Sequence, residues 1–228
     1  YIDVVLKDIK NLHLSVYPPS GRVHISAPER MDLDTIRMYA ISKLDWIKKQ
    51  QKKFSDQARE LPREYLNKEG HYFLGRRYLM KVIEHNMPPV ITIRHNIIEM
   101  RLRPNVDLIK KQAILEEWYR DQLKALAPPI IKKWEKIMKL KVNEYAIKKM
   151  RTKWGTCNAL AKRIWLNLEL IKKPVDCIEY IIVHEMIHLL ERKHNERFIF
   201  MMDKYLPEWR QLRMELNRLP VSHTEWKY

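Results

Sequence analysis

Residues 184–188 read His-Glu-Met-Ile-His, and this short segment constrains the fold more than any other part of the chain. Two histidines four residues apart lie one turn from each other on the same face of an α-helix, so both imidazoles can reach a single ion. The residues around them, many of them isoleucines, supply apolar faces that favour a buried helix. Asp176 and Glu179 are spaced like a capping box near its start. We therefore predict a buried helix that presents His184 and His188 on one face.

A third histidine, His194, follows His188 by six residues, which is enough for the chain to turn back toward the helix. The pattern H-E-x-x-H on a helix is typical of zinc peptidases, and a catalytic zinc takes three protein ligands and leaves a fourth position for water or substrate. We predict that His184, His188 and His194 hold one zinc ion per chain and that Glu185 is the general base. Metzincins place glycine three residues after the second histidine. This chain has Glu191 there, so we expect a turn of another kind.

Residues 151–158, Arg-Thr-Lys-Trp-Gly-Thr-Cys-Asn, form a second informative segment. Gly155, which follows a predicted strand, indicates a tight turn or a close approach of the backbone to another group. We interpret Cys157 as a buried free thiol, because three histidines already satisfy a catalytic zinc. Some basic and aromatic side chains are candidates for contact with substrate or for stabilising an oxyanion; they are Arg151, Lys153, Trp154, Arg197 and Tyr205. For Trp154, packing in the core is an equally good interpretation.

Hydrophobic periodicity indicates a chain that is mainly sheet at its start and mainly helix afterwards. Alternating apolar residues predict hairpins, and three- and four-residue spacing predicts helices. We expect Pro128 and Pro129 to break or kink the long helix, because proline cannot donate the helical hydrogen bond. The expected elements are a hairpin over 2–27, a helix over 32–54, hairpins over 71–83 and 90–103, a helix over 107–140, a strand over 145–150, and helices that begin near residues 195 and 207.

The chain carries 44 Lys and Arg residues against 28 Asp and Glu residues, a formal charge of +16. Such a charge would attract nucleic acid, nucleotides or acidic proteins, although scattered lysines are more often a solvated surface. No run of apolar residues reaches the length of a membrane span, so we expect a soluble protein with no membrane partner. Two cysteines are too few for a disulfide scaffold and fit a reducing cytoplasm. The sequence carries no indication of an oligomeric state.

These motifs together resemble the YgjP-like predicted metallopeptidases, relatives of the SprT-like zincins, and the resemblance runs nearly end to end. The family pattern is a strand that ends in a Trp-Gly-Ser-Cys-like turn, an asparagine at a strand exit, a proline before the H-E-x-x-H helix, and a following His-Asn step. In this chain it reads Lys153-Trp154-Gly155-Thr156-Cys157, Asn167, Pro174, His184-Glu185-x-x-His188 and His194-Asn195. Lys153 stands where the family usually has arginine, and Thr156 where it usually has serine.

The resemblance implies an α+β fold, with an antiparallel β-rich region and one long helix over residues 1–104 and a zincin-like metallopeptidase region over residues 105–228. It also implies the same metal ligands and the same catalytic Glu185, acting on a peptide or protein through water activated by zinc. Two alternatives stay open: a zinc-dependent nucleotide or phosphoanhydride hydrolase, encouraged by the basic charge, and a nucleic-acid-binding protein with a zinc site. One zinc on three histidines lacks the second metal of many phosphohydrolases, and structural zinc sites are usually closed by four ligands.

Overall fold

The computed structural model describes residues 1–17, 20–56, 64–150 and 153–218. The chain forms two compact units, residues 1–60 with 220–228 and residues 61–219. The fold is α+β, as predicted, with three separate sheets and six α-helices among the described residues. The division at residue 104 into a β-rich region and a metallopeptidase region stays a prediction. No helix in the described ranges has the length and hydropathy of a membrane span.

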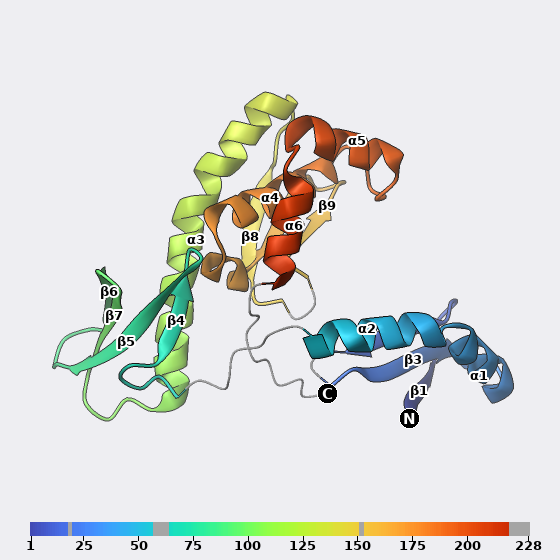
Figure 1. Cartoon of the computed structure of the whole chain (residues 1–228), viewed down its shortest axis with the longest axis horizontal. Coiled ribbons are helices and arrows are strands. Elements are labelled where there is room, and N and C mark those ends of the chain that lie inside the picture. Colours follow the sequence, from blue (N-terminus) through green and yellow to red (C-terminus); the bar gives the residue numbers. More distant parts are fainter. Residues whose placement is uncertain (18–19, 57–63, 151–152, 219–228) are drawn as a thin grey trace. The chain divides into compact units, whose positions relative to one another are not determined.

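The first unit combines a three-stranded sheet with two helices (Figure 1). Its elements are β1 (Ile2–Lys7), β2 (His13–Tyr17), β3 (Arg22–Pro28), α1 (Leu33–Ser42) and α2 (Leu44–Asp56). The hairpin predicted over residues 2–27 is right for β2 and β3, which pair antiparallel. It is wrong for β1, which is a separate strand and pairs with the other side of β3 in parallel. Ile25 and Ala27 of β3 pack in one buried cluster with Ile36 and Ala40 of α1. The sheet is therefore mixed, with β3 at its centre.

The single helix predicted over residues 32–54 is wrong in one respect, because the chain forms two helices with a break at Lys43. The hydroxyl of Ser42 donates to the carbonyl of Tyr39 at 2.7 Å, and such local bonds compete with the helical pattern and bend helices. The backbone of Lys43 then leaves helical geometry, at φ −106° and ψ 6°. Residue spacing does not reveal this break, since apolar residues keep the helical period on both sides of it.

The second unit begins with a four-stranded sheet in the order β4-β5-β7-β6. Its strands are β4 (Gly70–Phe73), β5 (Arg76–Glu84), β6 (Val90–Arg94) and β7 (Ile97–Leu102). The two outer pairs are the predicted antiparallel hairpins. The central pair of β5 and β7 is parallel, so this sheet is also mixed. Met80 of β5 and Ile98, Met100 and Leu102 of β7 lie in the core of the unit.

A long helix, α3 (Leu108–Met138), runs from the β4–β7 sheet toward the remaining helices (Figure 1). It continues across Pro128 and Pro129, so the predicted break does not occur. Pro128 has no N–H to donate to the carbonyl of Lys124, four residues earlier. The hydroxyl of Tyr145 donates to that carbonyl at 3.3 Å. A distant side chain thus supplies the hydrogen bond that proline removes.

The rest of the second unit is a three-stranded sheet with short helices around it (Figure 1). Its elements are β8 (Glu144–Lys148), β9 (Gly155–Asn158), β10 (Arg163–Asn167), the 3-10 helix η1 (Leu168–Lys172), α4 (Val175–Ile187), α5 (Glu196–Tyr205) and α6 (Trp209–Arg218). β10 lies between β8, its parallel neighbour, and β9, its antiparallel neighbour. Ile164 and Leu166 of β10 are fully buried with the apolar residues of α4. This packing fixes α4 relative to β9 and β10.

The starts of the three C-terminal helices differ in how well residue patterns predict them. Asn195 caps α5 as expected, with its side chain accepting the N–H of Phe198 at 3.0 Å. α6 begins at Trp209, two residues after Pro207, near which its start was predicted. The capping box predicted for α4 is wrong, because no side chain caps that helix. Glu179 accepts instead from the indole of Trp134 and the ammonium of Lys133, each at 2.6 Å, because these donors on α3 lie beside it.

Candidate metal centre

The structure brings the side chains of His184, His188 and His194 together. His184 is on α4, His188 ends that helix, and His194 lies just before α5. The Nε2 atom of His194 is 3.0 Å from Nε2 of His184 and 3.2 Å from Nε2 of His188. Two nitrogens that share a tetrahedral zinc at its usual bond length are roughly 3.3 Å apart. Both distances from His194 are therefore close to the spacing that one such ion requires, and the candidate ligand atoms of all three residues lie within 4.8 Å of one another.

One aromatic ring packs against all three imidazoles. The ring of Phe198, which is buried on α5, has its centroid 4.9 Å from that of His184, 4.8 Å from His188 and 4.7 Å from His194. Because a capped helix carries Phe198, the ring is held by the backbone of α5. Packing against a shared side chain limits the orientations that the three histidines can take.

The turn between His188 and His194 is built without glycine. α4 ends in a tightened turn in which Leu190 donates to the carbonyl of Ile187 at 2.8 Å. The carbonyl of Glu191 then lies 3.0 Å from Nδ1 of His188, and this contact fixes the face that Nε2 presents. The carboxylate of Glu191 accepts the N–H of Lys193 at 3.2 Å. The residue that stands in place of the metzincin glycine therefore organises this turn through its own oxygens.

Two of the histidines, His184 and His194, have lowered pKa values and so favour the neutral form that binds a metal. Burial lowers the pKa of His184 to about 3, and the neighbouring His188, His194 and Arg213 lower it further. Burial and then the same kind of charge repulsion lower the pKa of His194. Neutral imidazole is the state that donates a lone pair to a metal. Three nitrogen donors that face one point, with a carboxylate beside them, match the ligand chemistry of a catalytic zinc site.

Glu185 lies behind the histidines against the backbone of β9. Its exposed fraction is 5%, and this burial raises its pKa to about 8, with the charge of Lys153 opposing the rise. A Cβ atom placed on Gly155 would come within 2.7 Å of both Cγ and Oε1 of Glu185. Of the two roles expected for Gly155, the structure shows the close approach, because any side chain there would displace the carboxylate.

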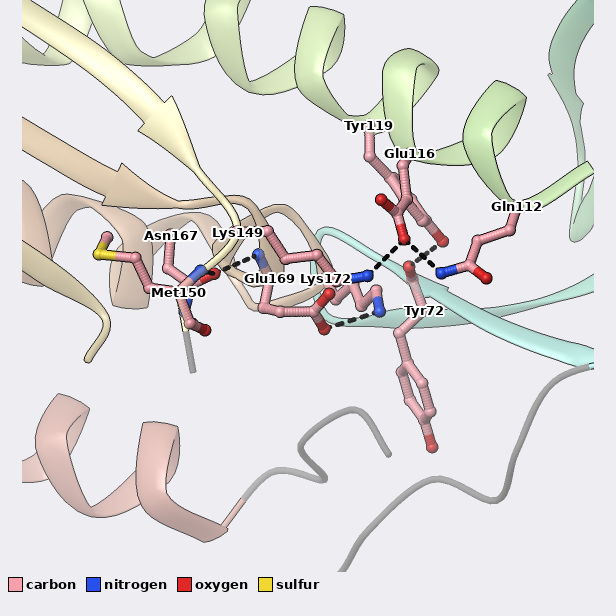
Figure 2. A network of polar contacts seen from close by, with 9 residues as sticks. All are labelled: Tyr72, Gln112, Glu116, Tyr119, Lys149, Met150, Asn167, Glu169 and Lys172. Carbon is pink, nitrogen blue, oxygen red and sulfur yellow. Dashed lines mark hydrogen bonds and ion pairs between the residues drawn. The ribbon is translucent and has the colours of Figure 1, made fainter. Parts of the chain in front are cut away.

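A buried amide holds the chain that leads into Gly155. Asn167, at the end of β10, donates from Nδ2 to the carbonyls of Met150 and Lys153, at 2.9 and 2.8 Å. Its Oδ1 accepts the N–H of Met150 at 3.3 Å and that of Glu169 at 3.2 Å. Figure 2 shows this amide beside the ion pair of Lys149 with Glu116 of α3, at 2.6 Å. Both contacts fix the end of β8, and Asn167 also fixes Lys153, two residues before Gly155.

The other residues predicted to contact substrate differ in their exposure and in their contacts. Arg151 lies outside the described residues. Lys153 is exposed and close enough to act on Glu185. Trp154 packs against the core, with the ammonium of Lys173 5.3 Å from its ring centroid. Arg197 lies 3.9 Å from the carboxylate of Glu191.

The remaining side chains include one that residue patterns missed. Tyr205 packs at the edge of the core at the far end of α5. Cys157 is a free thiol whose pKa is raised to about 11 by burial and by the charge of Glu185. Arg213 of α6, which acts on His184 and His194, was not predicted. Its role depends on α6 packing against α4, and no motif in the sequence signals that contact.

A match to a protein family agrees with the chemistry of this site. The family model described as YgjP-like, metallopeptidase domain, matches residues 10–219. Among solved structures, the chain is similar to the crystal structure of the metallopeptidase zymogen of Pyrococcus abyssi abylysin. That match has a TM-score of 0.36 and 18% identity, and it covers 41% of this chain and 97% of the other. No protein with a curated description matches the sequence.

Proposed function

The chain belongs to the YgjP-like metallopeptidase family, and we propose that it hydrolyses peptide bonds with a zinc ion held by His184, His188 and His194. The observation that carries the proposal is the convergence of three Nε2 atoms, 3.0 and 3.2 Å apart, beside a buried carboxylate. When bound, zinc supplies a Lewis acid that polarises a carbonyl and acidifies water. The side chains described below supply the proton transfers and the shape of the site.

Glu185 is the proposed general base and acid. Its carboxylate takes a proton from the attacking water and returns it to the nitrogen of the amine that leaves. Burial, which raises its pKa to about 8, makes the protonated form accessible near neutral pH, as the second half of this exchange requires. The positive charge of Lys153 favours the ionised form of Glu185, which is the form that takes the first proton. Gly155 leaves room for the carboxylate because it has no side chain.

The alternative of nucleotide hydrolysis gains no specific support. The described residues contain one group of three or more candidate metal ligands, which is the histidine triplet. Many enzymes that cleave phosphate esters or anhydrides use two metals held by several carboxylates. We therefore place peptide hydrolysis first and keep nucleotides as a test substrate.

The proposal predicts that Glu185→Gln leaves zinc bound and removes activity. We expect kcat on a mixed peptide library to fall by about 10²- to 10⁴-fold, the usual contribution of a positioned acid–base group. Zinc content measured by mass spectrometry should stay at one ion per chain. The matched control is Glu208→Gln, since Glu208 is exposed next to α6 and should keep full activity. Full activity of zinc-loaded Glu185→Gln, or hydrolysis of nucleotides and no peptide, would contradict the proposal.

A further inference from the structure

Cationic residues lie on several of the segments that border the histidine triplet and Glu185. All are exposed, and together we call them the basic rim; they are Lys153, Arg192, Lys193, Arg197 and Arg213. They come from the approach to β9, the turn between α4 and α5, the start of α5, and α6. Elements far apart in sequence thus bring the same sign of charge to one site.

Lys153 has a fixed backbone. Its carbonyl accepts from Asn167 at 2.8 Å, and two residues later Gly155 touches the Glu185 carboxylate. The side chain is exposed, and its charge reaches Glu185. A substrate carbonyl that approaches Glu185 would therefore pass near this ammonium.

Arg192 and Lys193 lie in the turn that ends at His194. Contacts at both ends fix this turn, because the Glu191 carbonyl lies 3.0 Å from Nδ1 of His188 and the Glu191 carboxylate accepts the Lys193 N–H. Burial raises the pKa of the Cys157 thiol, and the charge of Arg192 opposes that rise. Cys157 is on β9, two residues after Gly155, so Arg192 faces the same strand as Glu185 does.

Arg213 and Arg197 complete the basic rim. Arg213 is on α6, which packs against the helix α4 that carries His184. Arg197 directly precedes Phe198, the ring that packs against all three histidines. Both arginines therefore belong to elements that border the histidine triplet.

One ion pair offsets part of this charge. Among the described residues, Arg197 pairs with Glu191 at 3.9 Å, and no ion pair involves the other four residues of the basic rim. These four cations are exposed to solvent and open to an acidic ligand.

We propose that the basic rim selects peptides that carry Asp or Glu close to the bond that is cut. The inference rests on the peptidase function proposed above and names its substrate class. Exposed cations in high dielectric each contribute little, but several of one sign around a site add to a field that raises both the rate and the specificity of encounter. A peptide with carboxylates on both sides of its scissile bond can meet cations from β9, the α4–α5 turn and α6 together.

The test compares matched peptides with acidic, neutral or basic flanking residues. Binding to zinc-loaded Glu185→Gln is measured by fluorescence anisotropy, and cleavage by the native enzyme is measured in parallel. We expect the acidic peptide to bind about tenfold more tightly than the neutral one at low salt, with the advantage shrinking as salt screens the charges. The double reversal Arg192→Glu with Arg213→Glu should remove the preference, and the milder Arg192→Gln with Arg213→Gln should reduce it.

The control reverses a charge away from the site. Lys110 is exposed in the first turn of α3, and this end of the helix lies away from α5 (Figure 1). Lys110→Glu should leave the preference unchanged. Equal cleavage of acidic and neutral peptides would overturn this inference, as would a loss of preference in Lys110→Glu as large as that in the double reversal. Either result would leave the proposed peptidase function intact. Tighter binding of a phosphopeptide or nucleotide than of the acidic peptide would also overturn it. Absence of any peptide cleavage would overturn the peptidase function and this inference with it.

Discussion

At the scale of single residues, the burial of Glu185 links the stability of the metal-free protein to pH. Burial raises the pKa of this carboxyl from 4.5 to about 8. Between those values the folded protein holds a proton that the unfolded chain has released. The free energy of unfolding therefore falls as pH rises through this window. His184 acts in the opposite sense, because burial lowers its pKa from 6.5 to about 3, so its contribution is lost as pH falls below 6.5.

Replacing Glu185 with glutamine separates these two effects. In the presence of a chelator, Glu185→Gln should match the native protein near pH 4.5 and become progressively more stable than it up to about pH 8. The difference should grow by up to about 1.4 kcal/mol per pH unit. Urea titrations at several pH values measure it, and the histidine contribution cancels because both proteins carry it. A difference that does not change with pH would show that Glu185 ionises normally in the folded state.

Residue patterns predicted the parts of the site that lie close together in sequence. The spacing of His184, Glu185 and His188 fixes their relation on one helix, whatever the rest of the fold does. Gly155 was noticed because glycine is scarce in this chain, but its contact with Glu185 depends on how β9 packs on α4. Arg213 was missed because its place beside the histidines depends on the packing of α6. Tertiary contacts place Gly155 beside Glu185 and Arg213 beside the histidines, and local sequence preferences do not encode these contacts.

At the scale of secondary-structure elements, Asn167 joins the end of β10 to the segment that precedes β9. The residue is 5% exposed, and its carboxamide makes four hydrogen bonds to backbone groups. Backbone groups that lose a buried partner carry a desolvation cost, which exceeds the net gain of the bond itself. The amide therefore connects the end of β10 to the segment before β9 and to the 3-10 helix η1.

Asn167→Leu should lower the free energy of unfolding of the second unit by about 2–4 kcal/mol, because it leaves several buried backbone groups unpaired. The matched control is Asn143→Ala. Asn143 is exposed, and its side chain makes one long contact, 3.4 Å to the carbonyl of Ala161, so we expect a change within about 0.5 kcal/mol. If urea denaturation gave the same loss of unfolding free energy for both variants, the hydrogen bonds of Asn167 would contribute no more to stability than the single contact of Asn143.

Element prediction succeeded where the signal is local. The three hairpins follow from alternating apolar residues and turn residues. Two errors have local or distant hydrogen bonds as their cause: Ser42 interrupts a periodic helix, and Tyr145 sustains a helix through Pro128. The parallel pairs, such as β1 with β3, join strands that are not neighbours in the sequence. The periodicity of apolar residues does not predict the order of strands in a sheet.

At the scale of the whole molecule, all three candidate ligands belong to the unit of residues 61–219. A ligand that binds only the folded state stabilises it by about 4 kcal/mol at 1,000 times its dissociation constant. Added zinc should therefore slow hydrogen exchange in α4 and α5 and leave exchange in β1–β3 unchanged. Mass spectrometry of peptides from both units measures this, with His188→Ala as the control that should lose the effect. Equal protection of both units would contradict a site confined to the second.

The ring of Phe198 beneath the three histidines has a consequence for how an ion is captured. Side chains that are already packed have given up their rotational freedom during folding, so ordering them again is not a cost of association. The packing of Phe198 against all three rings therefore lowers the entropic cost of ordering the ligands when a cation binds. A side chain with no lone pair to donate contributes to metal affinity in this way.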